Sequence, residues 1–313
     1  MYTIDDKSQT ILEEEMKKLF ISIVIVVSAF TFVYASGSSP SCKTKYPLVF
    51  AHGMGAHATI SVFGFPIDQY WYKIPQTLES DGADCYITDV NAMDTTVNKA
   101  IALKTQVLQI LAVTGAAKVN IIGHSHGCLY SRYMISNLGM GSKVASYTGI
   151  GGPQRGSVIA DLIINGIPDS LKPAVAGALN LIYAFVFGDT NPNSLQNGYD
   201  LVRSYMINTF NPNTPDVKGI YYQSWAGKIV YASSSIVLAP TWLIMLPFEG
   251  DNDGLVSVNS AKWGNFRGVM SGNIVCPGVD HLNEVNQLFG VTPGFDALGF
   301  YVNMASDLKN RGY

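Results

Sequence analysis

The sequence predicts an α/β fold with a mostly parallel central sheet flanked by helices. Between about residues 46 and 150, short β-rich runs alternate with stretches of helical periodicity, which is typical of consecutive β-α-β units. The 313 residues are 48% hydrophobic and 14% charged, a composition that excludes a disordered chain. The chain shows no internal repeat and no interdomain linker, so we expect one large domain. A net charge of −3 gives no electrostatic reason to expect nucleic acid as a partner.

The N-terminal region has the pattern of an export signal. Met16-Lys17-Lys18 precedes a mostly apolar run over 19–34, and the small residue Ala35 follows it. We therefore predict a signal peptide at 16–35, a mature domain over 36–313 and a secreted protein, extracellular or periplasmic. Residues 1–15 carry five acidic groups against one lysine, so we interpret them as an over-called extension ahead of a start at Met16. A retained anchor is the alternative, but a spanning helix needs roughly 20 apolar residues.

Five β-rich runs are expected to form the sheet. The run at 46–51 is apolar and stops at a His-Gly pair, and the run at 85–90 follows an Asp-Gly turn. The runs at 118–122 and 144–150 lie on either side of a helical stretch. Strand character returns at 219–229.

Three helices are expected from the spacing of apolar residues. The helix over 95–114 ends at Gly115, and the helix over 126–138 ends at Gly139. The last helix spans about 296–309. Between these elements, residues 158–187 are small and aliphatic with little charge, which fits a buried helix pair or a mobile cover over an apolar site. Residues 188–218 are rich in Asn, Pro, Gly and Asp and are expected to form loops around one short helix.

One motif carries the chemistry: Gly123-His124-Ser125-His126-Gly127 is the only G-x-S-x-G of the chain. It lies between a predicted strand and a predicted helix, as a nucleophile elbow requires. Glycines at both ends permit the sharp turn that raises a serine hydroxyl above the sheet. Ser125 is therefore the candidate nucleophile.

Serine needs a base, and the base needs an orienting acid. In folds with this elbow the chain order is Ser, then Asp or Glu, then His. Only one histidine, His281, follows the elbow, so it is the candidate base. Asp253, in a polar turn expected at the end of a sheet strand, is the candidate acid. Asp251 is the second choice, and Asp280, adjacent to His281, is expected to point away.

An oxyanion hole for this nucleophile would use backbone N–H groups. One comes from the residue after the nucleophile, His126, and the other from the loop after the first strand. In His52-Gly53-Met54-Gly55 the second donor is assigned to Met54.

Six segments together resemble the Pseudomonas-type bacterial triacylglycerol lipases of the α/β-hydrolase superfamily. In chain order they are YPLVFAHGMG, KVNIIGHSHG, GIGGPQRGS, YYQSWAG, NDGLV and DHLNEVNQLFGV. The resemblance implies an α/β-hydrolase fold with a helical lid at about 155–190. It also implies a secreted carboxylic ester hydrolase that works at lipid–water interfaces. The family's nucleophile, acid and base match Ser125, Asp253 and His281, and its oxyanion donors match Met54 and His126.

The sequence departs from the family at its structural calcium site. The family holds this ion between two aspartates, at positions that are Ala239 and Asn283 here. Calcium prefers charged oxygen ligands, so we predict little or no calcium and no other cofactor or metal. Carbonyl groups of Gln287 and Val291 are expected to remain as remnants of the site.

The cysteines also depart from the family. The family disulfide is missing, because Asn259 stands six residues after the candidate acid. A replacement bridge between Cys42 and Cys85 is one connectivity that the sequence leaves open, and Cys128 is expected to be a buried thiol.

Competing functions use the same residues. Acyl transfer to an alcohol, phospholipid hydrolysis and polyester hydrolysis could all run on this triad, whereas a non-catalytic lipid-binding protein usually lacks one of its members. We expect a monomer whose partner is a lipid substrate at an interface, with a folding chaperone and secretion machinery as further candidate partners.

Overall fold

The computed structural model describes residues 41–54, 59–62, 65–166, 194–235 and 237–313. These residues belong to one compact unit, 40–313. The predicted extension, the signal peptide and most of the predicted lid lie outside the described residues. Among the residues that are described, no helix is long and apolar enough to cross a membrane.

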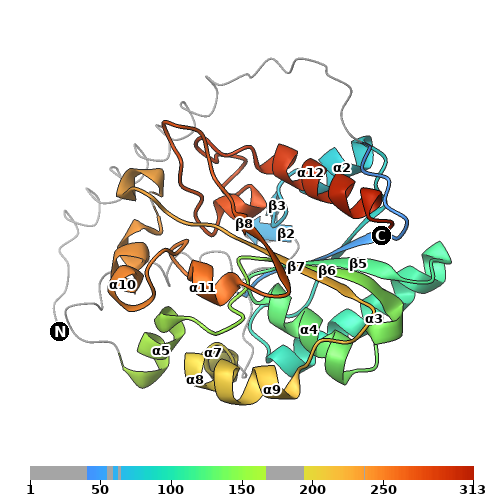
Figure 1. The fold of residues 1–313 in the computed structure, drawn as a ribbon, viewed down its shortest axis with the longest axis horizontal. Coiled ribbons are helices and arrows are strands. Elements are labelled where there is room, and N and C mark those ends of the chain that lie inside the picture. Colours follow the sequence, from blue (N-terminus) through green and yellow to red (C-terminus); the bar gives the residue numbers. More distant parts are fainter. Residues whose placement is uncertain (1–40, 55–58, 63–64, 167–193, 236) are drawn as a thin grey trace. The chain divides into compact units, whose positions relative to one another are not determined.

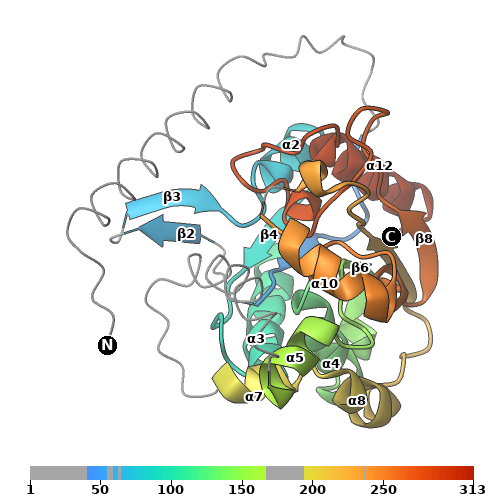
Figure 2. The same ribbon diagram turned by 90° about the vertical axis from the view of Figure 1, so that its left-hand side faces the viewer.

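A six-stranded parallel sheet forms the centre of this unit (Figure 1). Its spatial order is β4-β1-β5-β6-β7-β8, so the chain starts inside the sheet and then extends it in both directions. The strands are β1 (Leu48–Ala51), β4 (Cys85–Thr88), β5 (Val119–His124), β6 (Val144–Ile150), β7 (Tyr221–Ala226) and β8 (Asn265–Val269). A separate antiparallel hairpin, β2 (Thr59–Val62) with β3 (Phe65–Gln69), stands apart from this sheet (Figure 2).

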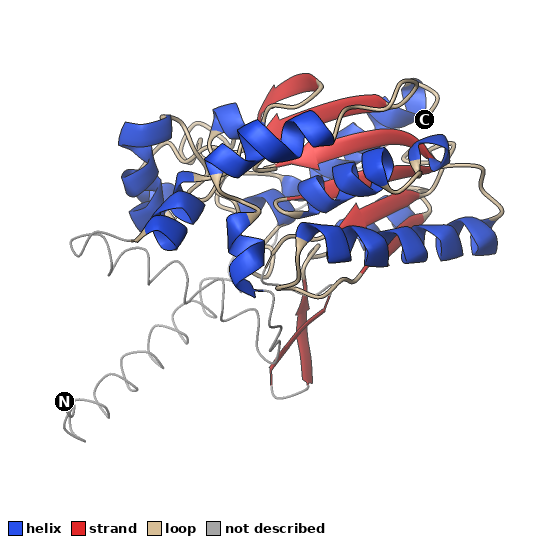
Figure 3. Cartoon of the chain, turned by 90° about the horizontal axis from the view of Figure 1, so that it is seen from below, coloured by secondary structure: helices blue, strands red, loops and turns tan. Residues whose placement is uncertain are grey.

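Helices cover both faces of the sheet (Figure 3). On one face, α2 (Ile74–Ser80) and α12 (Ala297–Asn310) pack against Leu48 and Phe50. On the other face, α3 (Thr96–Thr114) and α4 (Gly127–Asn137) pack against Val49 and Ala51. Because successive side chains of a strand point to opposite faces, the all-apolar β1 supplies both cores at once.

The remaining helical elements lie in the connections. The longer ones are α5 (Val158–Asn165) and α10 (Ala239–Glu249), which pack against each other through Val158, Ile159, Ile244 and Met245. The shorter ones are η1 (Gly141–Lys143), α7 (Ser194–Tyr199), α8 (Arg203–Tyr205), the π-helical turn η2 (Met206–Phe210), α9 (Asn211–Asn213), η3 (Ala232–Ser234), α11 (Val258–Ala261) and η4 (Asn283–Val285).

The fold class expected from the sequence is confirmed, with three corrections to its elements. The expectation that Asp253 ends a sheet strand is wrong, because the apolar run before it forms the helix α10. Strand β8 was not predicted, since all of its residues are exposed or only half-buried and its apolar pattern is weak. Residues 194–213 form several consecutive helical turns instead of the one short helix expected.

The four cysteines are thiols, so the Cys42–Cys85 bridge is not formed. The Cys42 thiol instead donates a hydrogen bond to the Asp81 carboxylate at 3.1 Å. Burial raises the pKa of Cys42 to about 12. The expectation that Cys128 is a buried thiol is confirmed.

Candidate active site

Ser125 occupies a strained turn between β5 and α4. Its φ of 54° lies in the left-handed region, which costs a non-glycine residue energy and often marks a functional site. Its N–H donates to Ile150 O at 3.0 Å, which ties the turn to the end of β6. A Cβ at Gly127 would lie 2.1 Å from Ala51 O, and a Cβ at Gly123 would lie 2.9 Å from Gly127 O. Both glycines of the motif are therefore required by close backbone contacts.

His281 and Asp253 meet although 28 residues separate them. His281 Nδ1 lies 2.8 Å from Asp253 Oδ2, and the His281 N–H donates to Asp253 O at 3.0 Å. The other carboxylate oxygen, Oδ1, accepts the N–H groups of Leu255 at 2.9 Å and Val256 at 2.7 Å. A carboxylate only accepts hydrogen bonds, so Nδ1 of His281 carries the proton and Nε2 keeps its lone pair. This is the tautomer that a general base needs.

The two other acid candidates have different partners. Asp251 is exposed and forms an ion pair with Lys228 at 3.0 Å. Asp280 accepts the Ser235 hydroxyl at 2.6 Å and the N–H groups of Leu282 and Asn283. Burial raises the pKa of Asp280. Of the three aspartates, Asp253 is the one bonded to the imidazole of His281.

The residue before Ser125, His124, lies close to this pair. The ring of His124 lies 4.5 Å from the ring of His281, centroid to centroid. In the described part of the chain, no hydrogen bond joins the Ser125 hydroxyl to His281. Such catalytic hydrogen bonds are often long until substrate binds.

The two predicted oxyanion donors come from the residue after the nucleophile and from the loop after β1. His126 directly precedes α4, so its N–H has no acceptor within the helix. Met54 follows Gly53, where an added Cβ would lie 3.4 Å from Ser125 Oγ. The loop after β1 therefore passes next to the serine hydroxyl, as the assignment of Met54 requires.

The His126 side chain is anchored at both ring nitrogens. Lys99 Nζ lies 3.1 Å from Nδ1, and Thr96 Oγ1 lies 2.8 Å from Nε2. An ammonium group only donates, so Nδ1 accepts and Nε2–H donates to Thr96. Burial and then the charge of Lys99 lower the pKa of His126 well below its usual value, so the ring is neutral. The Thr96 N–H in turn donates to Asp200 Oδ2 at 2.8 Å.

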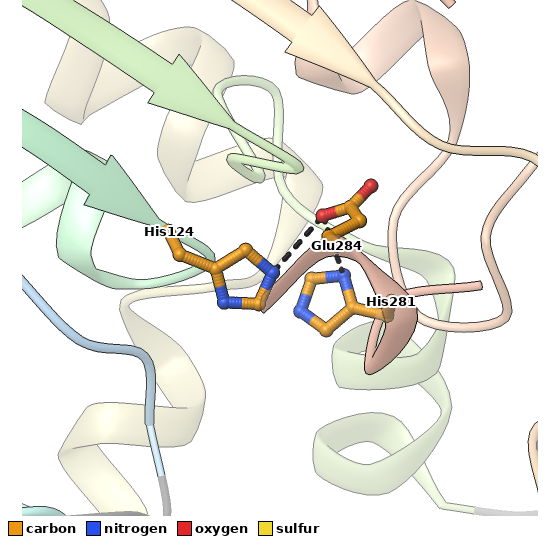
Figure 4. Close-up of side chains that lie close together, drawn as sticks. All are labelled: His124, His281 and Glu284. Atoms are coloured by element: carbon orange, nitrogen blue, oxygen red, sulfur yellow. Dashed lines mark hydrogen bonds and ion pairs between the residues drawn. The ribbon is translucent and has the colours of Figure 1, made fainter. Parts of the chain in front are cut away.

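A third carboxyl group, Glu284, was missed at the sequence level. Its Oε2 lies 3.0 Å from His124 Nε2 and 3.7 Å from His281 Nδ1 (Figure 4), and its Oε1 accepts the Gly227 N–H at 2.7 Å. Burial, and next the charge of Asp253, raise the pKa of Glu284 well above its usual range. Burial, and next His281, lower the pKa of His124. Both shifts favour the neutral forms of these side chains, the protonated carboxyl of Glu284 and the uncharged imidazole of His124. The signal that could have found it was an acidic residue one helical turn after the candidate base.

One group of described residues has donor atoms close enough together to hold a metal ion. It consists of His124, His281 and Glu284, whose atoms lie within 4.8 Å of one another. Their environment favours a hydrogen-bonded cluster instead. His281 Nδ1 is already bonded to Asp253, and Glu284 packs so closely on Gly151 that a Cβ there would lie 1.9 Å from Oε2. Glu284 has no room to retreat and admit an ion.

The two positions matching the family's calcium aspartates do not fit that ion. Ala239 begins α10 and has only a methyl side chain. The carboxamide of Asn283 presents Nδ2, a hydrogen-bond donor, to Gln287 O at 3.1 Å. Calcium needs oxygen ligands, most of them charged.

Comparison with known proteins identifies the family. A family model described as "alpha/beta hydrolase fold" matches residues 46–190. The chain is 32% identical to a triacylglycerol lipase of Vibrio cholerae serotype O1, over 93% of this chain and 99% of that protein. The chain belongs to the bacterial triacylglycerol lipases. It is also 30% identical to the lipase of Burkholderia plantarii, over 79% of this chain and 81% of that one.

Solved structures agree on the fold. The lipase of Staphylococcus hyicus has a TM-score of 0.60 at 18% identity, covering 89% of this chain and 98% of that one. EstA of Clostridium botulinum has a TM-score of 0.63 at 14% identity, covering 90% of this chain and 93% of that one. The predictions of an α/β-hydrolase fold and of a serine ester hydrolase are confirmed. Lipases of this superfamily work with protein side chains and need no cofactor.

Proposed function

We propose that this lipase hydrolyses triacylglycerols or related fatty-acyl esters through an acyl-enzyme, with Ser125 as nucleophile, His281 as base and Asp253 as orienting acid. The observation that carries the proposal is the hydrogen bond of 2.8 Å between His281 and Asp253, next to a serine at a strained strand-to-helix turn. The printed names of the relatives supply the substrate class.

The reaction begins when His281 Nε2 takes the hydroxyl proton of Ser125 as its oxygen attacks the ester carbonyl. Asp253 keeps Nδ1 protonated and stabilises the imidazolium that forms. The N–H groups of His126 and Met54 stabilise the oxyanion. The imidazolium then protonates the departing alcohol, and water, activated by the same histidine, releases the fatty acid.

Protonated Glu284 supports this cycle electrostatically. A second carboxylate beside Asp253 would favour imidazolium before substrate binds and would remove the base. Because burial keeps Glu284 neutral, the negative charge next to His281 is that of Asp253.

An apolar surface near the site supports a lipid–water interface as the partner. Leu243 and Phe248 of α10 are 55% and 56% exposed, and Ile163 of α5 is 37% exposed. The hydroxyl of Ser157, which caps α5, donates to Leu255 O at 2.6 Å, two residues after Asp253. The start of α5 is thus bonded to the turn that carries the proposed acid, and exposed apolar side chains near it fit a lipid-facing surface.

Three further proposals come from the sequence. Export through a signal peptide at 16–35 would place the enzyme outside the cytoplasm. We propose that it acts there as a monomer. A chaperone and secretion machinery would then assist its folding and export. Because Ala239 and Asn283 replace two calcium ligands, we also propose little or no calcium requirement.

The test uses Ser125→Ala, with Ser80→Ala as the matched control at an exposed helical serine. Ser125→Ala should abolish hydrolysis of a triacylglycerol chain-length series and labelling by a fluorophosphonate probe, while both variants unfold at the wild-type temperature. Wild-type turnover or labelling in Ser125→Ala would overturn the assignment.

A further inference from the structure

The loop that follows His281 is held by three carboxamide side chains. Asn283 Nδ2 donates to Gln287 O and Val291 O within the loop. Asn286 Nδ2 donates to Tyr72 O at 2.9 Å, and Gln287 Nε2 donates to Gln69 O at 2.5 Å. These bonds fasten the loop internally and to the segment before α2. All three donors are uncharged.

Asn283 has the central place in this arrangement. It is 5% exposed, and its own N–H donates to Asp280 Oδ1 at 2.8 Å, which fixes its backbone. Its Nδ2 lies 3.1 Å from Gln287 O and 3.5 Å from Val291 O. Its Oδ1 is buried and has no hydrogen-bond partner among the described residues. Two carbonyl oxygens on one side require a donor there, so the network sets the orientation of the amide.

The same two carbonyls are those expected to remain from the family's calcium site. Without a donor or a cation beside it, the carbonyl of Gln287, a residue that is 3% exposed, would lose its hydrogen-bond partner. We infer that the Asn283 carboxamide replaces the calcium ion by donating to Gln287 O and Val291 O, and so holds the His281 loop without metal.

This inference deepens the proposed calcium independence, and it concerns stability more than the chemical step. A carboxylate at position 283 would remove the hydrogen-bond donor. Its two oxygens only accept hydrogen bonds, so they would face the two carbonyl oxygens without a proton between them. That carboxylate and the two carbonyls would supply three of the oxygen ligands of a calcium ion, with water taking the place that Ala239 leaves open. The side chain at position 283 would therefore decide whether the two carbonyls face a hydrogen-bond donor or an acceptor that needs a cation beside it.

The experiment compares thermal unfolding of the wild type, Asn283→Asp and Asn283→Ala in excess chelator and in millimolar calcium, with calcium titrated calorimetrically into each protein. The wild type should unfold at the same temperature in both buffers and bind no calcium. Asn283→Asp should lose several degrees in chelator and recover most of them in calcium. Asn283→Ala is the control, because it loses the donor without gaining a ligand, and it should be destabilised equally in both buffers.

Three results would overturn the inference: calcium stabilisation of the wild type, Asn283→Ala as stable as the wild type, or Asn283→Asp equally destabilised in both buffers. If Asn283→Asp fails to fold in chelator, its refolding yield is compared with and without calcium. A higher yield in calcium supports the inference, and equal yields contradict it. Because the readout is unfolding, failure of the triad assignment would leave this result unchanged.

Discussion

Replacing Asp253 by asparagine should trap His281 in the wrong tautomer. Asp253 Oδ1 accepts two backbone N–H groups, from Leu255 and Val256, while Oδ2 faces His281 Nδ1. An asparagine oxygen should remain with the two N–H groups, which leaves its NH2 group facing the imidazole. Nδ1 must then accept, so the ring proton moves to Nε2, and His281 can no longer take the proton of Ser125.

The magnitude follows from the cost of turning the amide. A turned amide would leave two buried N–H groups without an acceptor, at about 1–3 kcal/mol each. A total of about 2–6 kcal/mol corresponds to a roughly 30-fold to 25,000-fold preference for the trapped form. We expect kcat of Asp253→Asn to fall by a factor in this range, toward the loss of about 10,000-fold known for a tautomer trap in a serine protease.

The assay is kcat on a soluble p-nitrophenyl ester at neutral pH, with unfolding temperatures to confirm that the variants are folded. Asp253→Ala is the matched variant, since it removes the carboxylate without imposing a tautomer. Its kcat should be at least as high as that of Asp253→Asn. A loss of less than tenfold in Asp253→Asn, or a clearly higher kcat than in Asp253→Ala, would refute the reasoning.

Three other predictions address the surroundings of the triad. Thr96→Val removes the hydroxyl that holds the His126 ring, so kcat should fall about threefold to tenfold with KM unchanged. Thr96→Ser keeps the hydroxyl and should retain wild-type kinetics. Equal losses of kcat in the two variants would contradict this prediction. Gly127→Ala places a Cβ 2.1 Å from Ala51 O, so circular dichroism should show loss of the folded protein, and a wild-type melting curve would be the contrary result. Because folding raises the pKa of Glu284 above its unfolded value of about 4.3, the folded state binds more protons, and stability falls as pH rises above that value. Glu284→Gln should make the unfolding temperature fall less steeply as pH rises above about 5; an unchanged slope would show that folding does not raise the pKa of Glu284.

The sheet was largely predictable because its central strands are locally distinctive. The apolar β1, β5 and β6 are buried on both faces, so each forms a short hydrophobic run that ends at a turn signal. Edge strand β8 is exposed or half-buried and has no such run. Helix α10 is apolar on most sides, so the spacing of its apolar residues has no helical or strand period. The sequence therefore does not distinguish a helix from a strand there.

The sequence by itself determined the chemical class and singled out the candidate nucleophile and the candidate base. The elbow is a local motif whose glycines are needed for local backbone contacts, and a single histidine follows it. Tertiary structure decided which aspartate faces that histidine, because Asp251, Asp253 and Asp280 differ in partners brought from elsewhere in the chain.

Only tertiary structure could reveal what surrounds the triad. Burial, and next the charge of Asp253, raise the pKa of Glu284, whereas in the sequence it reads as an ordinary surface acid. In the same way, the family resemblance places Asn283 where a calcium aspartate is expected, and the folded loop shows which carbonyls its amide bonds. Protonation and hydrogen-bond satisfaction depend on solvent exclusion and on neighbours distant in sequence, and both arise only when the chain is folded.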